Sequence, residues 1–553
     1  MADIVLINPR FSPSYWGLNY AMPFLDARAV LPAINLPLLA ALTPPEHSVT
    51  LIDENVEPID FDRCSRADIV GITGMNVQRR RMHEIVIELR RSGVFVVVGG
   101  PWVTVYPEDF EGLVSAIFIG EAEETWPRFL AEWSEGRHHS RYEQAGKTDM
   151  SSIPAPRLDL LTMGRYAYGG LQVSRGCPFT CEFCDIIIVF GRRPRVKTAA
   201  QVIAELEGLV AARKYDAFIV DDNLIGNKKA IKPILREIIA WQEANGYPLS
   251  FATEASIDLA EDEELMQLMV TANIDTVFVG IESPNEAALR ETKKVQNLAD
   301  RSGTMLEKVH RIQAAGMEVW SGMIVGFDND DEGVFELQRR FIQEARIVQA
   351  MVNILVAIPK TPLYTRLRNE GRLDNSGEMA NFGTISTNVI PLRIGRRALC
   401  DGYLDLMRDL YTPDAYFSRI DALYLDGKLR PNLGRDRYLR RRPWRWLKSR
   451  VGAALEGVFV FVQLMRLVPD VALRREYRRR LWNTIKRRPQ VTLLRLYCIK
   501  CALHFHYHQL VRQLVADRVT LATQADVAGP ELILDGVERS SREEIKRAAA
   551  HLH

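Results

Sequence analysis

Two series of short apolar segments, each segment followed by a helical pattern, constrain the fold of this chain more than any other feature. In the first series the segments are Asp3–Pro9, Ser48–Glu54, Asp68–Gly74, Val94–Gly100 and Ala116–Glu121. Runs rich in β-branched residues that end in Gly, Asn or Asp predict parallel strands buried on both faces. We therefore expect a doubly wound, Rossmann-like α/β domain over residues 1–140.

The second series begins after residues 141–167, a loop-rich stretch that we interpret as an interdomain linker. Its strand candidates begin at Leu171, Ala217, Ser250, Thr276, Glu318 and Met351. Amphipathic helical segments separate them, and six such units predict a partial (β/α)6 barrel over residues 168–370. Strand patterns then fade, which predicts a mainly α-helical C-terminal domain over residues 371–553.

The composition indicates a globular chain, with 47% hydrophobic and 25% charged residues. The first residues lack the basic and apolar regions of a secretory signal, so we expect a cytoplasmic protein. Seven cysteines are an odd number for such a chain, which favours metal or redox chemistry over a disulfide framework. Cys64 and Cys400 are isolated, and we expect both to be buried thiols.

Positive charge is concentrated in residues 428–500, which hold 21 Lys and Arg against 4 Asp and Glu in a chain whose formal net charge is only +1. This segment encloses the apolar run "GVFVFVQLM" after Glu456, which is far shorter than the roughly 20 residues needed to span a bilayer. Two interpretations stay open. The run either belongs to a buried helix with solvated basic flanks, or it lies on the inner face of the membrane with its arginines on anionic lipid.

Polar residues and glycines cluster where the strands of the first domain end. Ligands of doubly wound domains bind beyond the carboxyl ends of the strands, although a plain turn explains any single glycine pair equally well. The candidate ligand-binding residues there are Pro9, Thr73, Gly74, Met75, Asn76, Gln78, Gly99, Gly100, Thr104, Gly120 and Glu121.

Three cysteines, Cys177, Cys181 and Cys184, lie within "CPFTCEFC" just after the first barrel strand. Structural zinc normally has four protein ligands, and the only further pair, Cys498 and Cys501, is on a distant apparent helix. Three cysteines on a four-iron four-sulfur (4Fe–4S) cluster would leave one iron with an open coordination site. An open iron implies that another molecule binds it.

The spacing C-x-x-x-C-x-aromatic-C, with Phe183 in the aromatic place, resembles that of the radical S-adenosylmethionine (SAM) enzymes. The resemblance implies that the three cysteines hold a 4Fe–4S cluster whose free iron chelates SAM. It also implies an electron donor such as flavodoxin or ferredoxin, whose electron cleaves SAM to a 5′-deoxyadenosyl radical. The same resemblance implies SAM contacts at the ends of later strands: Asp221, Asp222, Asn223, Glu254, Glu282, Gly322 and Gly326. Each acidic residue among them could instead be a capping or ion-paired group.

An α/β domain ahead of such a barrel is similar to the cobalamin-binding subclass of this family. The D-x-H-x-x-G motif that supplies a histidine to cobalt is absent, so the lower face of cobalt would be open or met by Met75, Asn76 or Gln78. A degenerate domain that binds no cobalamin is the alternative. "FVGIESPNEAAL", "VDDNLIGN", "GYPLSFATEAS" and "NILVAIPKTPLYTRL" look like the branch containing the hopanoid C-2 methylases.

This resemblance implies methyl transfer from methylcobalamin to an unactivated carbon of an apolar, lipid or terpenoid-like substrate. A cobalamin-dependent cyclase or oxidoreductase without methyl transfer is one alternative. An RNA-modifying enzyme is another, but no separate RNA-binding module is recognisable, so nucleic acid is disfavoured.

The stretch "CIKCALHFHYH" invites a metal-site interpretation with His504, His506 and His508. Histidines spaced by two do not share one face of a helix. We expect an amphipathic interfacial helix there, with an auxiliary metal site as the alternative.

Overall fold

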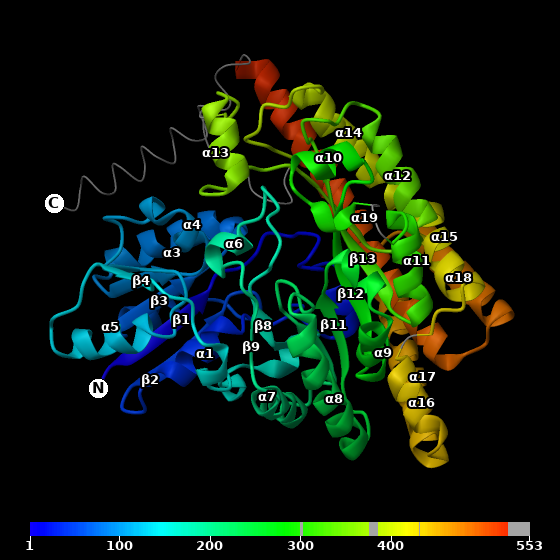
Figure 1. The fold of residues 1–553 in the computed structure, drawn as a ribbon, viewed down its shortest axis with the longest axis horizontal. Helices are drawn as coiled ribbons and strands as arrows, with labels where there is room; N and C mark the ends of the chain where they lie inside the picture. Colours follow the sequence, from blue (N-terminus) through cyan, green and yellow to red (C-terminus); the bar gives the residue numbers. More distant parts are fainter. Residues whose placement is uncertain (299–301, 375–384, 431, 529–553) are drawn as a thin grey trace.

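A computed structural model describes residues 1–298, 302–374, 385–430 and 432–528, with side chains described up to residue 518. The N-terminal sheet and the barrel lie side by side, and the C-terminal helices run along the far flank of the barrel (Figure 1). The predicted combination of two parallel α/β units and a helical C-terminal part is confirmed. The exact domain boundaries, at residues 140, 167 and 370, stay predictions.

The N-terminal sheet has six parallel strands in the order β2-β1-β3-β4-β5-β6. They are β1 (Asp3–Asn8), β2 (Ser48–Asp53), β3 (Ile69–Thr73), β4 (Phe95–Gly99), β5 (Ala116–Ile119) and β6 (Arg141–Glu143). Apolar side chains fill both faces, which are covered by α1 (Asn35–Leu42) and α5 (Thr125–Ser134) on one side and by α2 (Phe61–Ser65), α3 (Arg79–Arg91) and α4 (Pro101–Val105) on the other. The strand order reverses at β1 and β3, which is where such sheets bind ligands.

The sixth strand, β6, lies inside the stretch that the sequence predicts as a linker without strands. Only Tyr142 of its three residues is buried, between two exposed charged residues. The pattern of three residues cannot be distinguished from that of a loop. The strand forms because the edge of β5 offers it hydrogen-bonding partners.

The barrel has six parallel strands in the order β14-β13-β12-β11-β10-β7, as predicted. They are β7 (Gly169–Leu171), β10 (Asp216–Ile219), β11 (Ser250–Glu254), β12 (Ile274–Glu282), β13 (Glu318–Val325) and β14 (Ala350–Ile354). The outer helices are α7 (Ala199–Ala211), α8 (Lys228–Asn245), α9 (Glu263–Thr271), α10 (Glu286–Glu291), α11 (Met305–Ala315) and α12 (Val334–Glu344). A short antiparallel pair, β8 (Ser174–Arg175) and β9 (Arg195–Val196), encloses the cysteine loop and α6 (Ile186–Val189).

The C-terminal part is helical throughout its described residues, except for short connections. Its helices are α13 (Pro362–Asn369), α14 (Arg396–Leu410), α15 (Pro413–Ile420), α16 (Leu433–Arg440), α17 (Pro443–Leu467), α18 (Val471–Arg487) and α19 (Val491–Ala528). Residues 375–384 and 529–553 of the predicted domain lie outside the described residues. None of the described helices is both long enough and apolar enough to cross a bilayer.

Helix α19 packs against the barrel and is buried around "CIKCALHFHYH", so the expectation of an interfacial helix there is wrong. Nζ of Lys500 lies 2.6 Å from Oε1 of Glu318, and the Tyr507 hydroxyl donates to Oε1 of Gln349 at 2.7 Å. His504 hydrogen-bonds with the Tyr477 hydroxyl at 2.7 Å, and His506 accepts from the Tyr20 backbone N–H at 3.3 Å. Burial lowers the pKa of both histidines, to about 3 and about 4 respectively, so they act as neutral core residues.

Candidate active site

The loop that carries the three cysteines is folded back on itself between β8 and β9. Gly176 has φ = +95°, and a Cβ there would lie 2.9 Å from the Gly191 carbonyl oxygen. The Cys177 N–H donates to the same carbonyl at 3.2 Å. Only glycine fits this turn. The turn sets the direction of the chain as it enters the cysteine loop.

Two neutral amide donors and the ammonium group of Lys294 lie near the thiols of the loop. Nδ2 of Asn223 lies 3.8 Å from Sγ of Cys177, and Nε2 of Gln296 lies 3.5 Å from Sγ of Cys181. Burial raises the pKa of Cys177, and raises that of Cys184 well above its usual value. Metal binding to these cysteines must therefore release protons.

The donor set fits an iron–sulfur cluster better than a single metal ion. Across the described residues, no three His, Cys, Asp or Glu side chains converge as the ligands of one ion would. Cysteines on a 4Fe–4S cluster each bind a different iron, so their sulfurs stand apart. All seven cysteines are free thiols, and Cys64 and Cys400 are buried, as expected.

Acidic side chains end the second and third barrel strands. The Asp222 carboxylate accepts from the Gly176 N–H at 2.8 Å, and burial raises its pKa to about 7. Burial and neighbouring carboxylates raise the pKa of Glu254 to about 8. Asp221 has a structural role, because its two oxygens accept from the Val173 N–H and the Ser174 hydroxyl, both at 2.7 Å.

Glu282 ends β12 in a strained backbone conformation, with φ = +63°. Its Oε1 accepts from Nζ of Lys294 at 2.7 Å, and Asn297 donates to the neighbouring Ile281 carbonyl at 2.9 Å. A non-glycine residue held in the left-handed region costs about 1–3 kcal/mol and is often found at functional sites.

Gly322 in β13 and Gly326 just after the strand lie against different parts of the fold. Gly322 faces the barrel interior, where a Cβ would lie 3.1 Å from Cζ of Phe278. Gly326 has φ = +103°, and a Cβ there would meet Leu399 of α14 at 2.9 Å. Gly322 therefore leaves space inside the barrel, whereas Gly326 allows a helix to approach.

At the carboxyl edge of the N-terminal sheet, several predicted ligand-binding residues hold the loops together. The Gln78 side chain is buried, donates to Asn8 and Pro9, and accepts from the Met75 N–H at 3.0 Å. Gly100 has φ = +97°, and a Cβ there would collide with Thr73. Met75 remains exposed toward the barrel.

Glu121 links the two α/β units instead of facing open space. Its carboxylate lies 3.0 Å from Nη1 of Arg175 and 2.8 Å from Nη2 of Arg195, and its side chain is only 1% exposed. These arginines belong to the β8–β9 pair that encloses the cysteine loop. Nearby, Oγ1 of Thr104 accepts from the Gly120 N–H at 3.0 Å. These contacts fix the loop against the N-terminal sheet.

One cavity of about 1930 Å³ joins these parts. It extends from the β1/β3 edge of the N-terminal sheet, past the cysteine loop, into the barrel interior. The predicted site residues that line it are Met75, Asn76, Phe183, Cys184, Asp221, Asp222, Glu254, Glu282 and Gly322. The predicted residues that do not line it are Cys177, Cys181, Asn223, Gly326, Pro9, Thr73, Gly74, Gln78, Gly99, Gly100, Thr104, Gly120 and Glu121.

Sequence reasoning missed three side chains that the fold brings to this site. Trp102 of α4 and Trp16 line the cavity, and Nζ of Lys294 lies 5.8 Å from the centre of the Phe183 ring. Trp16 and Lys294 lie in segments without a regular pattern. Trp102 directly follows the "GGP" strand end, so its position next to a predicted ligand edge was a usable signal.

Three family models match successive parts of the chain. A B12 binding domain matches residues 24–130, the radical SAM superfamily matches residues 171–340, and a domain of unknown function matches residues 361–519. The first covers β2 to β5 of the N-terminal sheet, and the second covers most of the barrel.

Known proteins resemble the chain over most of its length. An uncharacterized methyltransferase of Synechocystis sp. is 38% identical over 75% of this chain and 77% of its own length. The hopanoid C-2 methylase of Rhodopseudomonas palustris is 31% identical over 88% of this chain and 89% of its own. The structure of the cobalamin-dependent SAM radical enzyme OxsB, at 15% identity, matches 94% of this chain and 80% of its own with a TM-score of 0.58, which indicates a shared fold.

Proposed function

Because the chain belongs to the cobalamin-dependent radical SAM enzymes, in the branch of the hopanoid C-2 methylase, we propose that it methylates an unactivated carbon of an apolar, lipid or terpenoid-like substrate. The enzyme is a radical SAM C-methyltransferase that uses a 4Fe–4S cluster, SAM and cobalamin. When bound, these cofactors supply a hydrogen-abstracting radical and a methyl donor. The substrate class and the residue roles below are our proposal.

The residues of the chain divide between holding the cofactors and excluding water. Cys177, Cys181 and Cys184 would bind the cluster. Glu254 and Asp222 face the cavity where the amino and carboxylate groups of SAM would lie. The pKa of Glu254 is raised to about 8, which leaves it largely protonated near neutral pH, and the pKa of Asp222 is raised to about 7. Binding of the SAM ammonium group would favour their ionised forms. Met75 and Asn76 face the same cavity from the B12-binding side.

The observation that carries the substrate proposal is the continuity of the cavity. It connects the cysteine loop and the ligand edge of the N-terminal sheet to an interior lined by aromatic side chains. A radical site that opens directly onto an apolar interior excludes water from a reactive carbon. Such an interior suits a hydrocarbon substrate better than an ionic one.

The test is anaerobic turnover of the reconstituted protein with methyl-labelled SAM and lipid extract of the host, followed by mass spectrometry of the lipids. We expect a labelled lipid that contains one additional methyl group. An unlabelled product that is cyclised or oxidised would instead support the cyclase alternative. Label recovered only in RNA would refute the lipid proposal.

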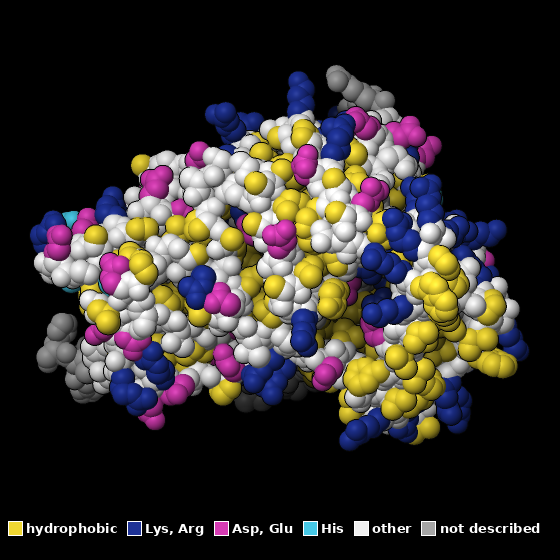
Figure 2. Space-filling model, turned by 90° about the horizontal axis from the view of Figure 1, so that it is seen from below, with side chains coloured by type: hydrophobic (Ala, Val, Ile, Leu, Met, Phe, Trp, Pro, Cys, Tyr) yellow, Lys and Arg dark blue, Asp and Glu magenta, His cyan; other side chains and the backbone are white. Residues whose placement is uncertain are grey.

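We further propose that α17 places the enzyme on an anionic membrane surface. One stripe of this helix exposes apolar side chains, with Leu455 68% and Val458 61% exposed. The others on the stripe are Leu447, Val451, Phe459 and Val462. Figure 2 shows the apolar patch with Lys and Arg side chains around it, the arrangement expected of a helix that lies on an anionic bilayer.

Vesicle flotation tests this surface. We expect the full-length protein to float with vesicles that contain phosphatidylglycerol, and to do so less at high salt. Leu455→Asp should reduce flotation, whereas Leu392→Asp, at a leucine that is 63% exposed outside the C-terminal helices, should not. Equal flotation of the two variants would contradict the proposal.

A further inference from the structure

We propose, building on the proposed function, that the barrel interior is the substrate channel. An elongated, flat polycyclic hydrocarbon enters it at the amino-terminal ends of the strands, beside α17, and reaches the cysteine loop with its leading edge. Entry at this end differs from the usual position of barrel active sites, which lie and open at the carboxyl ends of the strands.

The cavity passes through the barrel from one end to the other. At the amino-terminal ends of the strands it is lined by Asp216, Ser250, Asp275, Thr276, Glu318 and Gln349. At the carboxyl ends it is lined by Asp222, Glu254, Glu282, Ile324 and Leu355. The six residue steps from Asp216 to Asp222 correspond to a passage roughly 20 Å long.

Small residues at interior positions keep the passage open. Barrel interiors are normally filled by layers of bulky side chains, but here Ala252, Gly280 and Gly322 stand at interior positions of neighbouring strands. A Cβ at Gly322 would press on the Phe278 ring. The open space is therefore built into the sequence of the strands.

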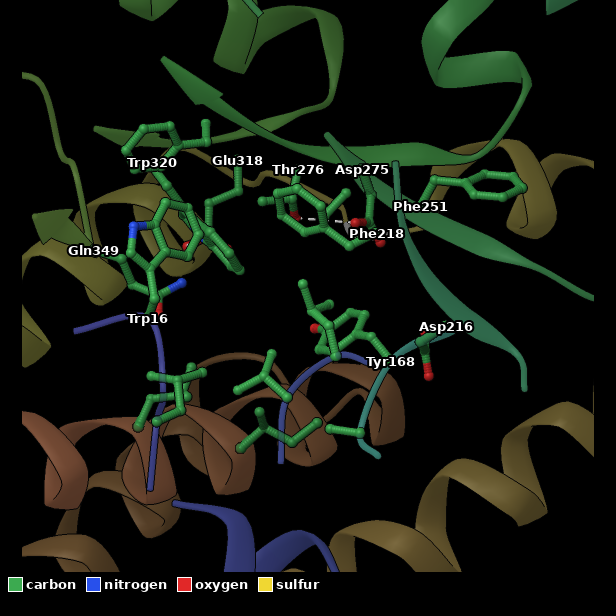
Figure 3. Close-up of a pocket in the computed structure, with 18 of the residues that line it drawn as sticks. Trp16, Tyr168, Asp216, Phe218, Phe251, Asp275, Thr276, Glu318, Trp320 and Gln349 are labelled. Carbon is green, nitrogen blue, oxygen red and sulfur yellow. Dashed lines mark hydrogen bonds between the residues drawn. The ribbon is translucent and has the colours of Figure 1, made fainter. Parts of the chain in front are cut away.

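Aromatic rings form the walls of the passage, and Figure 3 shows several of them pointing into it. The Trp16 ring centroid lies 4.7 Å from that of Phe278 and 6.2 Å from that of Phe218. Although Trp16 lies inside the barrel, 38% of it is exposed, because it faces the open cavity. Trp320 lines the same space. Flat rings along the walls of a cavity favour a flat apolar molecule.

The carboxyl ends of the strands are covered by the N-terminal domain. Nζ of Lys147 donates to the Val189 carbonyl at 2.6 Å, and Nζ of Lys360 donates to the Thr104 carbonyl at 2.9 Å. Together with the buried pairs of Glu121, these contacts hold the N-terminal sheet and the segment after it over the cofactor end. The opposite end is the direction from which a bulky molecule can enter.

Helices α17 and α19 form the entrance at the amino-terminal ends of the strands. Trp446, Ala453 and Phe459 of α17 line the cavity, as do Leu496 and Ile499 of α19. Phe459 also belongs to the exposed apolar stripe of α17 and is 41% exposed. The channel lining is therefore continuous with the surface that we propose contacts lipid, and a hydrocarbon can pass between them without crossing water.

The entrance carries carboxyl groups that can accept a hydrogen bond from the end of the substrate. Glu318 is neutralised by Lys500, but Asp275 accepts only from the Thr276 hydroxyl, at 3.0 Å, among the hydrogen bonds of the described residues. Asp216 and Tyr168 line the same cavity and lie below Asp275 in the view of Figure 3. Carboxyl oxygens accept hydrogen bonds from hydroxyl groups, so a hydroxyl group on the trailing end of the substrate would find an acceptor there.

Binding of the fluorescent tetracyclic sterol dehydroergosterol to the full-length protein tests the channel, with energy transfer from tryptophan as the readout. Ala453→Trp narrows the entrance and should weaken sterol binding roughly tenfold or more. Ala454→Trp is the matched control, because it adds the same ring to the next residue of α17, which does not line the cavity. Trp16→Phe should lower energy transfer while leaving the affinity nearly unchanged.

Two results would overturn the channel: wild-type affinity in Ala453→Trp, or unchanged energy transfer in Trp16→Phe. Sterol binding does not require turnover. If the variants bind the sterol as expected but the protein methylates no lipid, the channel stands and only the proposed function is refuted. Methylation of lipid at the wild-type rate by Ala453→Trp would refute the channel and leave the proposed function standing.

Discussion

Nζ of Lys294 lies 2.7 Å from Oε1 of Glu282 and 5.8 Å from the centre of the Phe183 ring. One side chain thus joins the strained end of β12 to the aromatic residue of the cysteine loop. Burial lowers the pKa of Lys294, but the charge of Glu282 outweighs burial and the pKa is raised. The ammonium group therefore stays charged beside the thiols, where it favours thiolates.

Lys294→Met should destabilise the cofactor-free protein and reduce cluster loading. Removing one partner of a buried pair typically costs about 3–5 kcal/mol, because the other charge is left unpaired. Denaturant unfolding and iron content after reconstitution measure the two effects. Lys293→Met is the control, since Lys293 pairs with Glu182 at 2.8 Å but is 60% exposed, and such surface pairs contribute about 0–1 kcal/mol. Similar losses in both variants would contradict the role of Lys294.

Glu121→Gln should loosen the contact between the N-terminal sheet and the cysteine loop. Arg175 keeps its ion pair with Glu123 at 2.6 Å, but the half-buried Arg195 loses its one carboxylate partner among the described residues, at a cost of about 3 kcal/mol. Limited proteolysis within the β8–β9 segment should become faster. Glu111→Gln, which breaks the exposed pair with Arg141, should leave the cleavage rate unchanged. Equal cleavage of both variants would show that the link is unimportant.

The stability of the cofactor-free protein should fall as the pH rises from about 5 to about 8. The pKa of Glu254 is about 8 in the fold and about 4.3 in an unfolded chain. Between these values the folded state holds a proton that the unfolded state releases, so rising pH favours unfolding. Thermal unfolding of Glu254→Gln should show a shallower decline than wild type. Glu263→Gln, at an exposed residue, should decline like wild type, and a wild-type slope in Glu254→Gln would contradict this assignment.

Cys184→Ala should abolish SAM cleavage and lower the iron content, because the cluster would lose one of its three protein ligands. Cys400→Ala is the matched control at another cysteine whose pKa burial raises. The formation of 5′-deoxyadenosine under anaerobic reduction is the readout. Retained cleavage in Cys184→Ala, or equal loss in both variants, would refute the assignment of the cluster ligands.

Local patterns in the sequence were enough to predict most of the fold. The β-branched runs of both α/β units form parallel strands, because such runs are stable only when covered on both faces. The strand β6 escaped prediction because three residues carry too little pattern. The buried "CIKCALHFHYH" stretch was assigned to an interface, because the spacing of its histidines argues against a metal site and the sequence does not show which elements cover the helix.

The candidate site could be predicted only where the spacing of residues along the chain indicates what they bind. Cys177, Cys181 and Cys184 lie close in sequence, so their local geometry limits what they can bind. Glu121 and Gln78 were predicted as ligand-binding residues from their position at strand ends, yet they hold loops and domains together. Their partners are distant in sequence, and no local pattern predicts which carboxylate a guanidinium will reach.

The sequence alone therefore determined the two parallel sheets, the cysteine loop and the class of cofactors, because each depends on residues close together in the chain. Only the tertiary structure decided that α19 packs against the barrel, that Trp16 stands inside it, and that Lys294 meets Glu282. It also decided that the cavity runs toward the apolar stripe of α17. These relationships join segments up to several hundred residues apart, and they arise from the packing of whole elements.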